Sequence, residues 1–190
     1  MVTMFTTMLS FAKEVSFFTI TKDAKTTSLT LSNVKAGDLL SIIDNNEVVL
    51  YKETIQQDGI YKKGFDLSTF PNGSYVFELN KAVEIRTMPF TINNNTVNFD
   101  KNAEKTIYKP ITRVQDNTVF ISRLSLEKKT LSIEIYFNSD NLSYSQSDLI
   151  YSEKIKNTEN INRVFKLADF NKGTYRIIFN TDGKVFTEEI

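Results

Sequence analysis

Residues 51–80 read YKETIQQDGIYKKGFDLSTFPNGSYVFELN, and residues 151–180 read YSEKIKNTENINRVFKLADFNKGTYRIIFN. Aligned without a gap at an offset of 100, the two stretches are identical at nine of thirty positions, whereas ordinary composition predicts about two identities. This similarity indicates a tandem duplication within the chain of 190 residues. The identical pairs are Tyr51/Tyr151, Glu53/Glu153, Ile55/Ile155, Phe65/Phe165, Leu67/Leu167, Phe70/Phe170, Gly73/Gly173, Tyr75/Tyr175 and Asn80/Asn180.

The duplication extends to both sides of these stretches. The further matches are residues 28–32 with 118–122, 40–42 with 131–133, and 84–92 with 184–190. Between the two units lies Asp100–Lys105, a polar run without an apolar period, which is typical of a boundary. The sequence therefore predicts two domains, residues 13–103 and residues 104–190, after an N-terminal segment of residues 1–12.

Each unit has the residue pattern of β-strands. Apolar residues recur at every second position, which places them on one face of a pleated segment, and no window keeps a helical period for three turns. Turn residues separate the segments, and Asp182-Gly183 is a good signal for a two-residue hairpin because both residues tolerate positive φ. About six to eight short strands per unit predict an all-β fold of two tandem immunoglobulin-like β-sandwich domains.

The most informative local motif is Phe-x-Leu-x-x-Phe-x-x-Gly-x-Tyr, which occurs once in each unit. Its apolar residues are expected to close one end of the sandwich, and its glycine to allow a tight corner; if that glycine has positive φ, a β-branched residue in its place would be strained. Its tyrosine is expected to be buried at the start of the next strand, with the hydroxyl bonded to upstream backbone. The alternative is that the two tyrosines stack on a ligand. The motif residues are Phe65, Leu67, Phe70, Gly73, Tyr75 and Phe165, Leu167, Phe170, Gly173, Tyr175.

The composition excludes many kinds of chemistry. The chain contains no His and no Cys, so it has no imidazole base, no thiolate nucleophile and no His or Cys ligand for a metal, haem or cluster. Lys plus Arg and Asp plus Glu both number 23, so no overall charge favours nucleic acid. We expect a protein that is not an enzyme, uses no cofactor and does not bind nucleic acid.

The N-terminal segment MVTMFTTMLSFA resembles the apolar part of a secretory signal peptide. It is uncharged and ends in the small-x-small triplet Ser10-Phe11-Ala12, just before Lys13. It lacks the basic residues that begin a signal peptide, which a true start upstream of Met1 would explain. The alternative is a first β-strand. Twelve residues are too few to span a bilayer, which takes about 20, so we do not expect an integral membrane protein.

Three motifs follow one another in the second unit: Tyr-x-Glu-x-Ile from residue 151, the Phe-to-Tyr motif from residue 165, and Asp-Gly-Lys-x-Phe-Thr from residue 182. This order resembles the C-terminal sorting domain of type IX secretion cargo in Bacteroidetes, and it is similar to small secreted immunoglobulin-like domains of that phylum. The resemblance implies export to the periplasm, the cell surface or the medium. Sorting domains of that family tend to end in a basic strand, whereas this chain ends in Glu188-Glu189-Ile190, so we expect a structural or binding domain here.

These observations favour a non-catalytic exported protein that acts through protein contacts, as an adhesin, a scaffold or a secretion-associated module. The alternative is a carbohydrate-binding module of the cell envelope, which an exposed, coplanar pair of aromatic rings would support. The loops Asp44–Glu47, Asn138–Asn141 and Asn180–Asp182 carry oxygen ligands that suit calcium. Asn and Asp are also the residues that turns select, and none of the three loops has the spacing of a known calcium site, so no metal is predicted.

Overall fold

The structure is a computed structural model that describes residues 17–22, 26–139, 147–168 and 173–190. This part of the chain is almost entirely β-structure, with two single-turn 3₁₀ helices, η1 (Leu67–Thr69) and η2 (Lys101–Ala103). None of its helices has the length and apolar character needed to cross a membrane. The predicted all-β class is confirmed. The segment 1–12, interpreted as a signal peptide, lies outside the described residues.

Contacts divide the described chain into two compact units. The first contains most of residues 17–104, and the second contains residues 105–190 together with Asp38–Leu40 and Glu78–Thr87. The predicted boundary near residue 103 thus falls where the longest stretch of the second unit begins, while two short stretches of the first repeat are grouped with the second unit.

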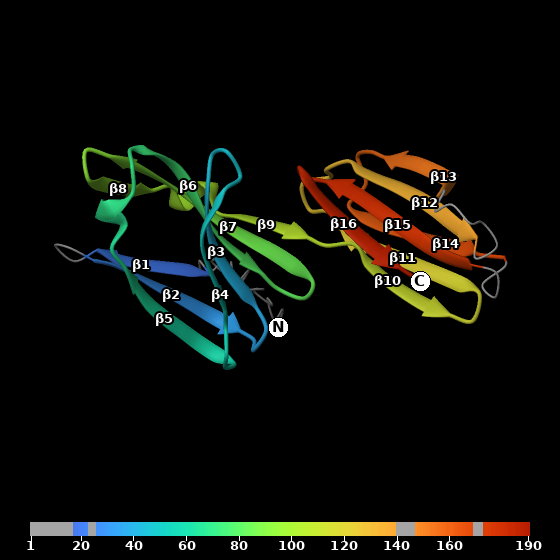
Figure 1. The fold of residues 1–190 in the computed structure, drawn as a ribbon, viewed down its shortest axis with the longest axis horizontal. Helices are drawn as coiled ribbons and strands as arrows, with labels where there is room; N and C mark the ends of the chain where they lie inside the picture. The colour runs from blue at the N-terminus through green and yellow to red at the C-terminus, as the bar shows by residue number, and fades with distance from the viewer. Residues whose placement is uncertain (1–16, 23–25, 140–146, 169–172) are drawn as a thin grey trace, which may run out of the picture. The chain divides into compact units, whose positions relative to one another are not determined.

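The strands of the first repeat form two antiparallel layers (Figure 1). One sheet has the order β1-β2-β5 and the other the order β4-β3-β6-β7-β8, with β9 paired to the first half of β7. The strands are β1 (Phe18–Lys22), β2 (Thr27–Val34), β3 (Leu39–Asp44), β4 (Val49–Thr54), β5 (Gly59–Phe65), β6 (Gly73–Asn80), β7 (Glu84–Asn93), β8 (Thr96–Phe99) and β9 (Lys105–Tyr108).

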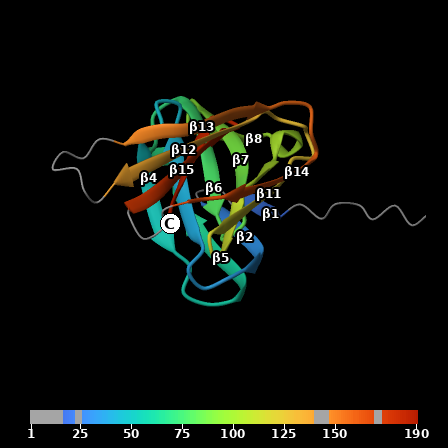
Figure 2. The same ribbon diagram turned by 90° about the vertical axis from the view of Figure 1, so that its right-hand side faces the viewer.

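The second repeat has the same plan. Its sheets have the orders β10-β11-β14 and β13-β12-β15-β16, and β12, β13 and β15 lie side by side in both ribbon views (Figures 1 and 2). The predicted hairpin joins β15 to β16, with Asp182 and Gly183 at φ values of 52° and 73°. The strands are β10 (Ile111–Gln115), β11 (Thr118–Leu124), β12 (Leu131–Ser139), β13 (Asp148–Ile155), β14 (Asn160–Lys166), β15 (Gly173–Thr181) and β16 (Lys184–Glu189).

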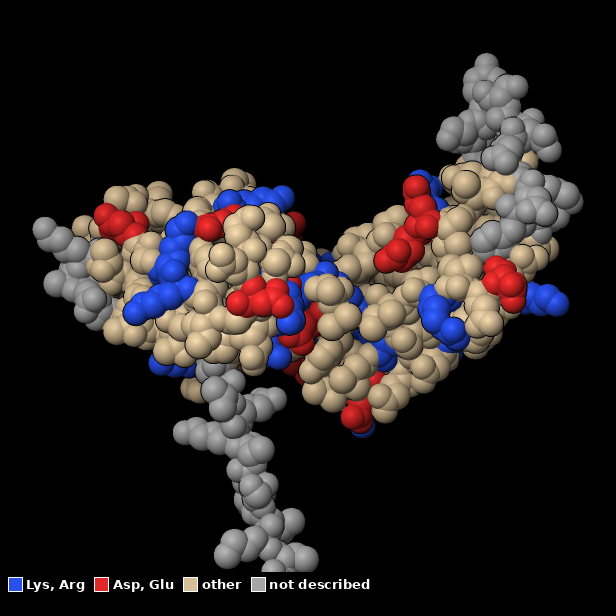
Figure 3. Space-filling view, turned by 90° about the horizontal axis from the view of Figure 1, so that it is seen from below, with Lys and Arg blue, Asp and Glu red and all other residues tan. Residues whose placement is uncertain are grey.

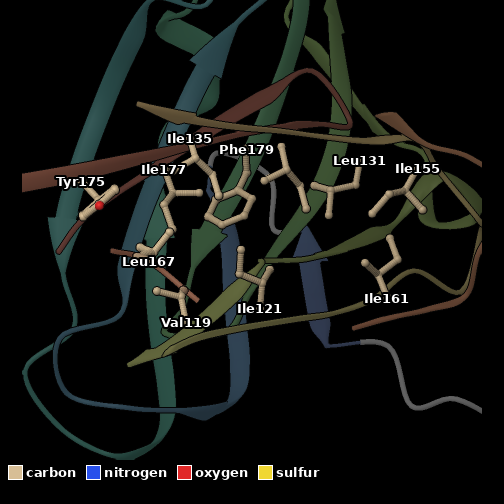
Figure 4. Close-up of a cluster of buried hydrophobic side chains, with 11 residues drawn as sticks. Val119, Ile121, Leu131, Ile135, Ile155, Ile161, Leu167, Tyr175, Ile177 and Phe179 are labelled. Atoms are coloured by element: carbon tan, nitrogen blue, oxygen red, sulfur yellow. The ribbon is translucent and has the colours of Figure 1, made fainter. Parts of the chain in front are cut away.

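Each sandwich has its own apolar core between its two sheets. In the second repeat, side chains of β12 and β15 face side chains of β11 and β14, as Figure 4 shows. The alternation read from the sequence puts Tyr175, Ile177 and Phe179 on the inner face of β15, and all three are buried. Burying one such side chain stabilises the fold by about 1.5–3 kcal/mol.

The register of the second strand corrects the sequence alignment. Leu29 pairs with Lys63 in the first repeat, and Ile121 pairs with Arg163 in the second. Because Lys63 and Arg163 are equivalent at the offset of 100, Leu29 is equivalent to Ile121, not to Val119 as the sequence match of residues 28–32 with 118–122 implies. By the same register, Leu31 is equivalent to Arg123.

Candidate functional site

The tyrosines of the repeated motif occupy matching places in the two sandwiches. Tyr75 lies near the start of β6 with 5% of its surface exposed, and Tyr175 lies near the start of β15 with 4% exposed. The hydroxyl of Tyr75 donates a hydrogen bond to the carbonyl oxygen of Pro71 over 2.7 Å, and that of Tyr175 donates to the carbonyl of Ala168. Both rings are thus part of the core, and their hydroxyls stabilise the turn that precedes the strand. The buried rings are therefore not available to stack on a ligand.

The other apolar residues of the motif surround this corner. Phe65, Leu67 and Leu167 are buried, whereas Phe165 and Phe70 are half-buried. The ring of Phe70 meets that of Tyr75 edge-on, with 5.6 Å between the ring centroids. Phe170, which occupies the equivalent place in the second motif, lies outside the described residues.

The two glycines of the motif differ in their surroundings. Among the described residues, the glycines with positive φ are Gly37, Gly59 and Gly183, so Gly73 and Gly173 do not serve a left-handed corner. Gly173 is instead required for close packing. A methyl group there would overlap the backbone carbonyl of Asn138, whereas a methyl group at Gly73 would come no closer than 3.4 Å, to the hydroxyl of Tyr75.

A polar cluster closes one edge of the first sandwich. Glu53 on β4 accepts hydrogen bonds from the hydroxyls of Tyr51 and Tyr61 and from the ammonium of Lys63 on β5. Strands β4 and β5 belong to different sheets, so the Glu53–Lys63 ion pair joins the two layers at their edge.

The second sandwich repeats this cluster with a stronger cation. The guanidinium of Arg163 donates from Nε to Oε2 of Glu153 over 2.8 Å and from Nη2 to Oε1 over 2.6 Å. Tyr151 donates to the same carboxylate over 3.0 Å. The fork of Arg binds a carboxylate through two parallel hydrogen bonds, which Lys cannot do, so the pair in the second sandwich is the more tightly oriented.

These ion pairs are not predicted in the sequence analysis, although the repeat retains both a carboxylate and a cation at the positions concerned. Glu53 and Glu153 are identical in the repeat, and Lys63 aligns with Arg163, so a carboxylate and a cation are both maintained. A lysine on an edge strand such as β5 commonly opposes pairing with another sheet. The structure shows that Lys63 has a defined carboxylate partner instead.

The acid stability of the first sandwich should depend on Glu53. The hydrogen bond from Lys63, followed by that from Tyr51, lowers the pKa of Glu53 from 4.5 to about 2. A lowered pKa contributes stability that is complete above the ordinary pKa and is lost as the pH falls from about 4.5 to about 2. We expect the free energy of unfolding to decrease over this interval, and to decrease less in the Glu53→Gln variant.

The carboxyl ¹³C shift of Glu53 followed by pH titration measures this pKa directly. Lys63→Met, which removes the main cause of the shift, should move the midpoint back toward 4.5. Lys52→Met, which changes an exposed lysine on β4, the strand of Glu53, is the matched control and should leave the midpoint unchanged. A wild-type midpoint near 4.5 would contradict the ion pair.

Exposed apolar side chains occupy equivalent positions in the two repeats. Val49 and Leu50 on β4 are 51% and 45% exposed, and Leu149 and Ile150 on β13 are 53% and 51% exposed. Both strands lie at the edge of their sheet. Ile135 of β12 pairs with Tyr151 of β13, and the next residue, Tyr136, pairs with Leu149, so Ile150 is the extra residue of a β-bulge in β13. A bulge at an edge redirects a side chain.

Charged side chains of both signs are mixed on the face seen in Figure 3, and the described residues include no cluster of metal ligands. Figure 3 shows Lys and Arg interspersed with Asp and Glu on the face in view. Among the described residues, no three Asp or Glu side chains converge as metal ligands would. The carboxylate of Asp44 instead accepts the backbone N–H groups of Asn46 and Val48, which is the turn interpretation of the Asp44–Glu47 loop.

The strand order defines the fold as two tandem immunoglobulin-like β-sandwiches of antiparallel sheets. No model of a protein family matches the sequence, and no curated protein matches it either. Solved structures that resemble it include a biofilm-associated protein, BSP domain, with 13% identity over 87% of this chain and 26% of that chain, at a TM-score of 0.25.

Two further solved structures have comparable similarity. The chicken CNTN1 FN1–FN3 domains are 13% identical over 88% of this chain and 60% of that chain, at a TM-score of 0.28. The native alpha-2-macroglobulin of Escherichia coli is 11% identical over 90% of this chain and 68% of that chain. The chain thus spans about a quarter of the length of the biofilm-associated protein and less than two thirds of the CNTN1 fragment.

Proposed function

We propose that this chain is a non-catalytic, exported module of tandem immunoglobulin-like sandwiches that acts through protein contacts. The observation that carries the proposal is the repeated apolar pair on the edge strands, Val49 and Leu50 on β4 and Leu149 and Ile150 on β13. Single exposed apolar residues are common on protein surfaces, but the same pair exposed at the same place in both copies of a duplication is not explained by chance exposure.

An edge strand is suited to binding another protein. Its outward backbone N–H and C=O groups have no strand partner in the sheet, so they can pair with an incoming strand, while apolar side chains beside them add buried area. Lys52 and Lys154 lie on the same strands and are exposed. Lysines at an edge oppose indiscriminate pairing, so these edges favour a partner that accommodates the positive charge.

Export and the absence of catalysis are supported by the sequence. The apolar segment 1–12 and the resemblance of the second unit to secreted domains support export, and a chain with no His and no Cys lacks the most common catalytic groups. The resemblance to type IX sorting domains suggests a bacterial envelope as the place in which contacts form.

Site-specific photo-crosslinking in intact cells tests the proposal. A photoreactive residue placed at position 50 or 150 should give the same discrete adduct in the envelope or medium fraction, because the two edges are equivalent. The same residue placed at Ala36 or Lys128, both exposed and in turns between inner strands, should not give that adduct. Recovery of the chain only from the cytosol, or equal adducts from all four positions, would contradict the proposal.

A further inference from the structure

The first unit carries a surface groove that the edge strands do not explain. Its volume is about 720 Å³, and its walls come from the turn after β3, from β6, β7 and β8, and from η2. Pockets of about 300–1,000 Å³ are the size that binds small ligands or the side chains of a peptide. All lining residues belong to the first compact unit.

The groove lies on the outer face of its sheet. Tyr75 and Phe77 on β6 are buried in the core, so the alternating residues Ser74 and Val76 face outward. On the neighbouring strands Thr91 pairs with Asn98, and both are exposed. Val76 and Pro89 therefore form an apolar floor beside the hydroxyl and amide groups of Ser74, Thr91 and Asn98.

One wall of the groove is formed by strand β8 and helix η2, which follow β7. The β7–β8 turn is well defined, because Asn94 and Asn95 have φ values of 47° and 59° and the amide oxygen of Asn72 accepts the N–H of Asn94 over 2.9 Å. The backbone N–H of Asp100 donates to Pro89, which fixes η2 beside the floor.

The two ends of the groove are acidic. Asp44 lies at the end of β3, and Asp100 caps η2. Each uses its Oδ1 atom to accept backbone N–H groups, which leaves Oδ2 for another donor. Neither carboxylate forms an ion pair with a Lys or Arg of the described residues, and no basic residue lines the groove. The groove is therefore complementary to a cation.

We propose that this groove binds a basic, extended segment of a partner protein. A Lys or Arg side chain of that segment pairs with Asp44 or Asp100, and its apolar stem lies on Val76 and Pro89. The hydroxyl and amide groups of Ser74, Thr91 and Asn98 then bond to the backbone of the segment. A sugar is less well matched. Of the aromatic residues that line the groove, Tyr75 and Phe90 are buried, and the half-buried ring of Phe99 packs on Phe90 with 5.3 Å between the ring centroids, so these rings serve the core.

Titration of the full chain with synthetic peptides, followed by two-dimensional NMR, tests the proposal. The probe is acetyl-TKTKT-amide, and the comparison ligands are acetyl-TETET-amide and cellohexaose. The lysine peptide should shift the amide signals of Ser74, Val76, Thr91 and Asn98, and higher salt should weaken its binding. The glutamate peptide and the hexasaccharide should leave these signals unchanged.

The matched variants test the carboxylates. In the double variant Asp44→Asn, Asp100→Asn the amide oxygens still accept the backbone N–H groups, so the fold is retained while the charge is removed. Its Kd for the lysine peptide should rise about tenfold. Asp116→Asn, at an exposed turn of the second unit, should leave the Kd unchanged. Unchanged binding in the double variant, binding of the sugar at these residues, or equal binding of both peptides would overturn the proposal.

Discussion

Gly173→Ala is expected to lower the free energy of unfolding of the second sandwich by about 2–3 kcal/mol, whereas Gly73→Ala should change that of the first by less than about 0.5 kcal/mol. The two glycines are identical members of the repeat, and both begin a strand that leads to a buried tyrosine. The expected difference arises from their surroundings.

The methyl group of an alanine at position 173 would overlap the carbonyl oxygen of Asn138 and lie 2.9 Å from Cε2 of Phe137. Asn138 and Phe137 belong to β12, which pairs with β15 in this region, so backbone rather than a flexible side chain would have to move. At position 73 the nearest atom is the hydroxyl of Tyr75 at 3.4 Å, an ordinary contact. The smaller entropy of alanine in the unfolded chain then offsets a slight crowding.

Amide hydrogen exchange in denaturant, read separately for β6 and β15, measures the two changes. A loss of protection confined to the second sandwich in Gly173→Ala would show that each repeat has an independent core. Equal losses in both sandwiches would mean that the repeats unfold as one cooperative unit. No loss in Gly173→Ala would contradict the close approach of β12 and β15.

The fold class could be predicted from the sequence, because both units retain the alternation of apolar residues at an offset of about 100. The same two-residue alternation does not determine which residues of β2 and β11 are equivalent. A shift by two residues keeps every apolar side chain on the same face, so the alignment of Ser28 with Thr118 and the true equivalence of Ser28 with Phe120 have the same hydrophobic pattern. Only the cross-strand pairs with β5 and β14 distinguish them.

Contacts between distant strands could not be predicted from sequence. The requirement for Gly173 arises from Asn138, which lies 35 positions earlier in the chain, and the groove depends on η2 lying beside Pro89. By contrast, the burial of Tyr75 and Tyr175 follows from local pattern alone, since alternation fixes the face and the preceding turn supplies the acceptor.

The corrected register also explains the position of a buried ion pair, Arg123–Asp182, in the second sandwich. Arg123, whose side chain is 1% exposed, occupies the place that Leu31 fills in the first repeat. Its Nη2 donates to Oδ2 of Asp182 over 2.8 Å, and its Nε donates to the carbonyl oxygen of Tyr108 over 3.0 Å. Nη1 has no partner among the described residues. Burial lowers the pKa of the Arg123 guanidinium, and Asp182 opposes that effect.

Asp182→Asn is expected to destabilise the second sandwich by about 3 kcal/mol, because it leaves the guanidinium of Arg123 buried without a counter-ion. Asparagine adopts the left-handed conformation of Asp182 as readily as aspartate does. The substitution therefore removes the charge without straining the turn. Arg123→Leu should cost about 1 kcal/mol or less, since leucine suits the site and Asp182 retains Lys105 at 3.3 Å.

Combining the two substitutions decides between a buried charge pair and a solvated one. The double variant Arg123→Leu, Asp182→Asn should be more stable than Asp182→Asn alone, because the uncompensated cation has been removed, and urea unfolding of the four proteins gives the coupling free energy of the cycle. Additive effects in this cycle, or an Asp182→Asn variant as stable as the wild type, would mean that water reaches Arg123. In that event the second repeat would tolerate an arginine at the place of Leu31 through hydration rather than through Asp182.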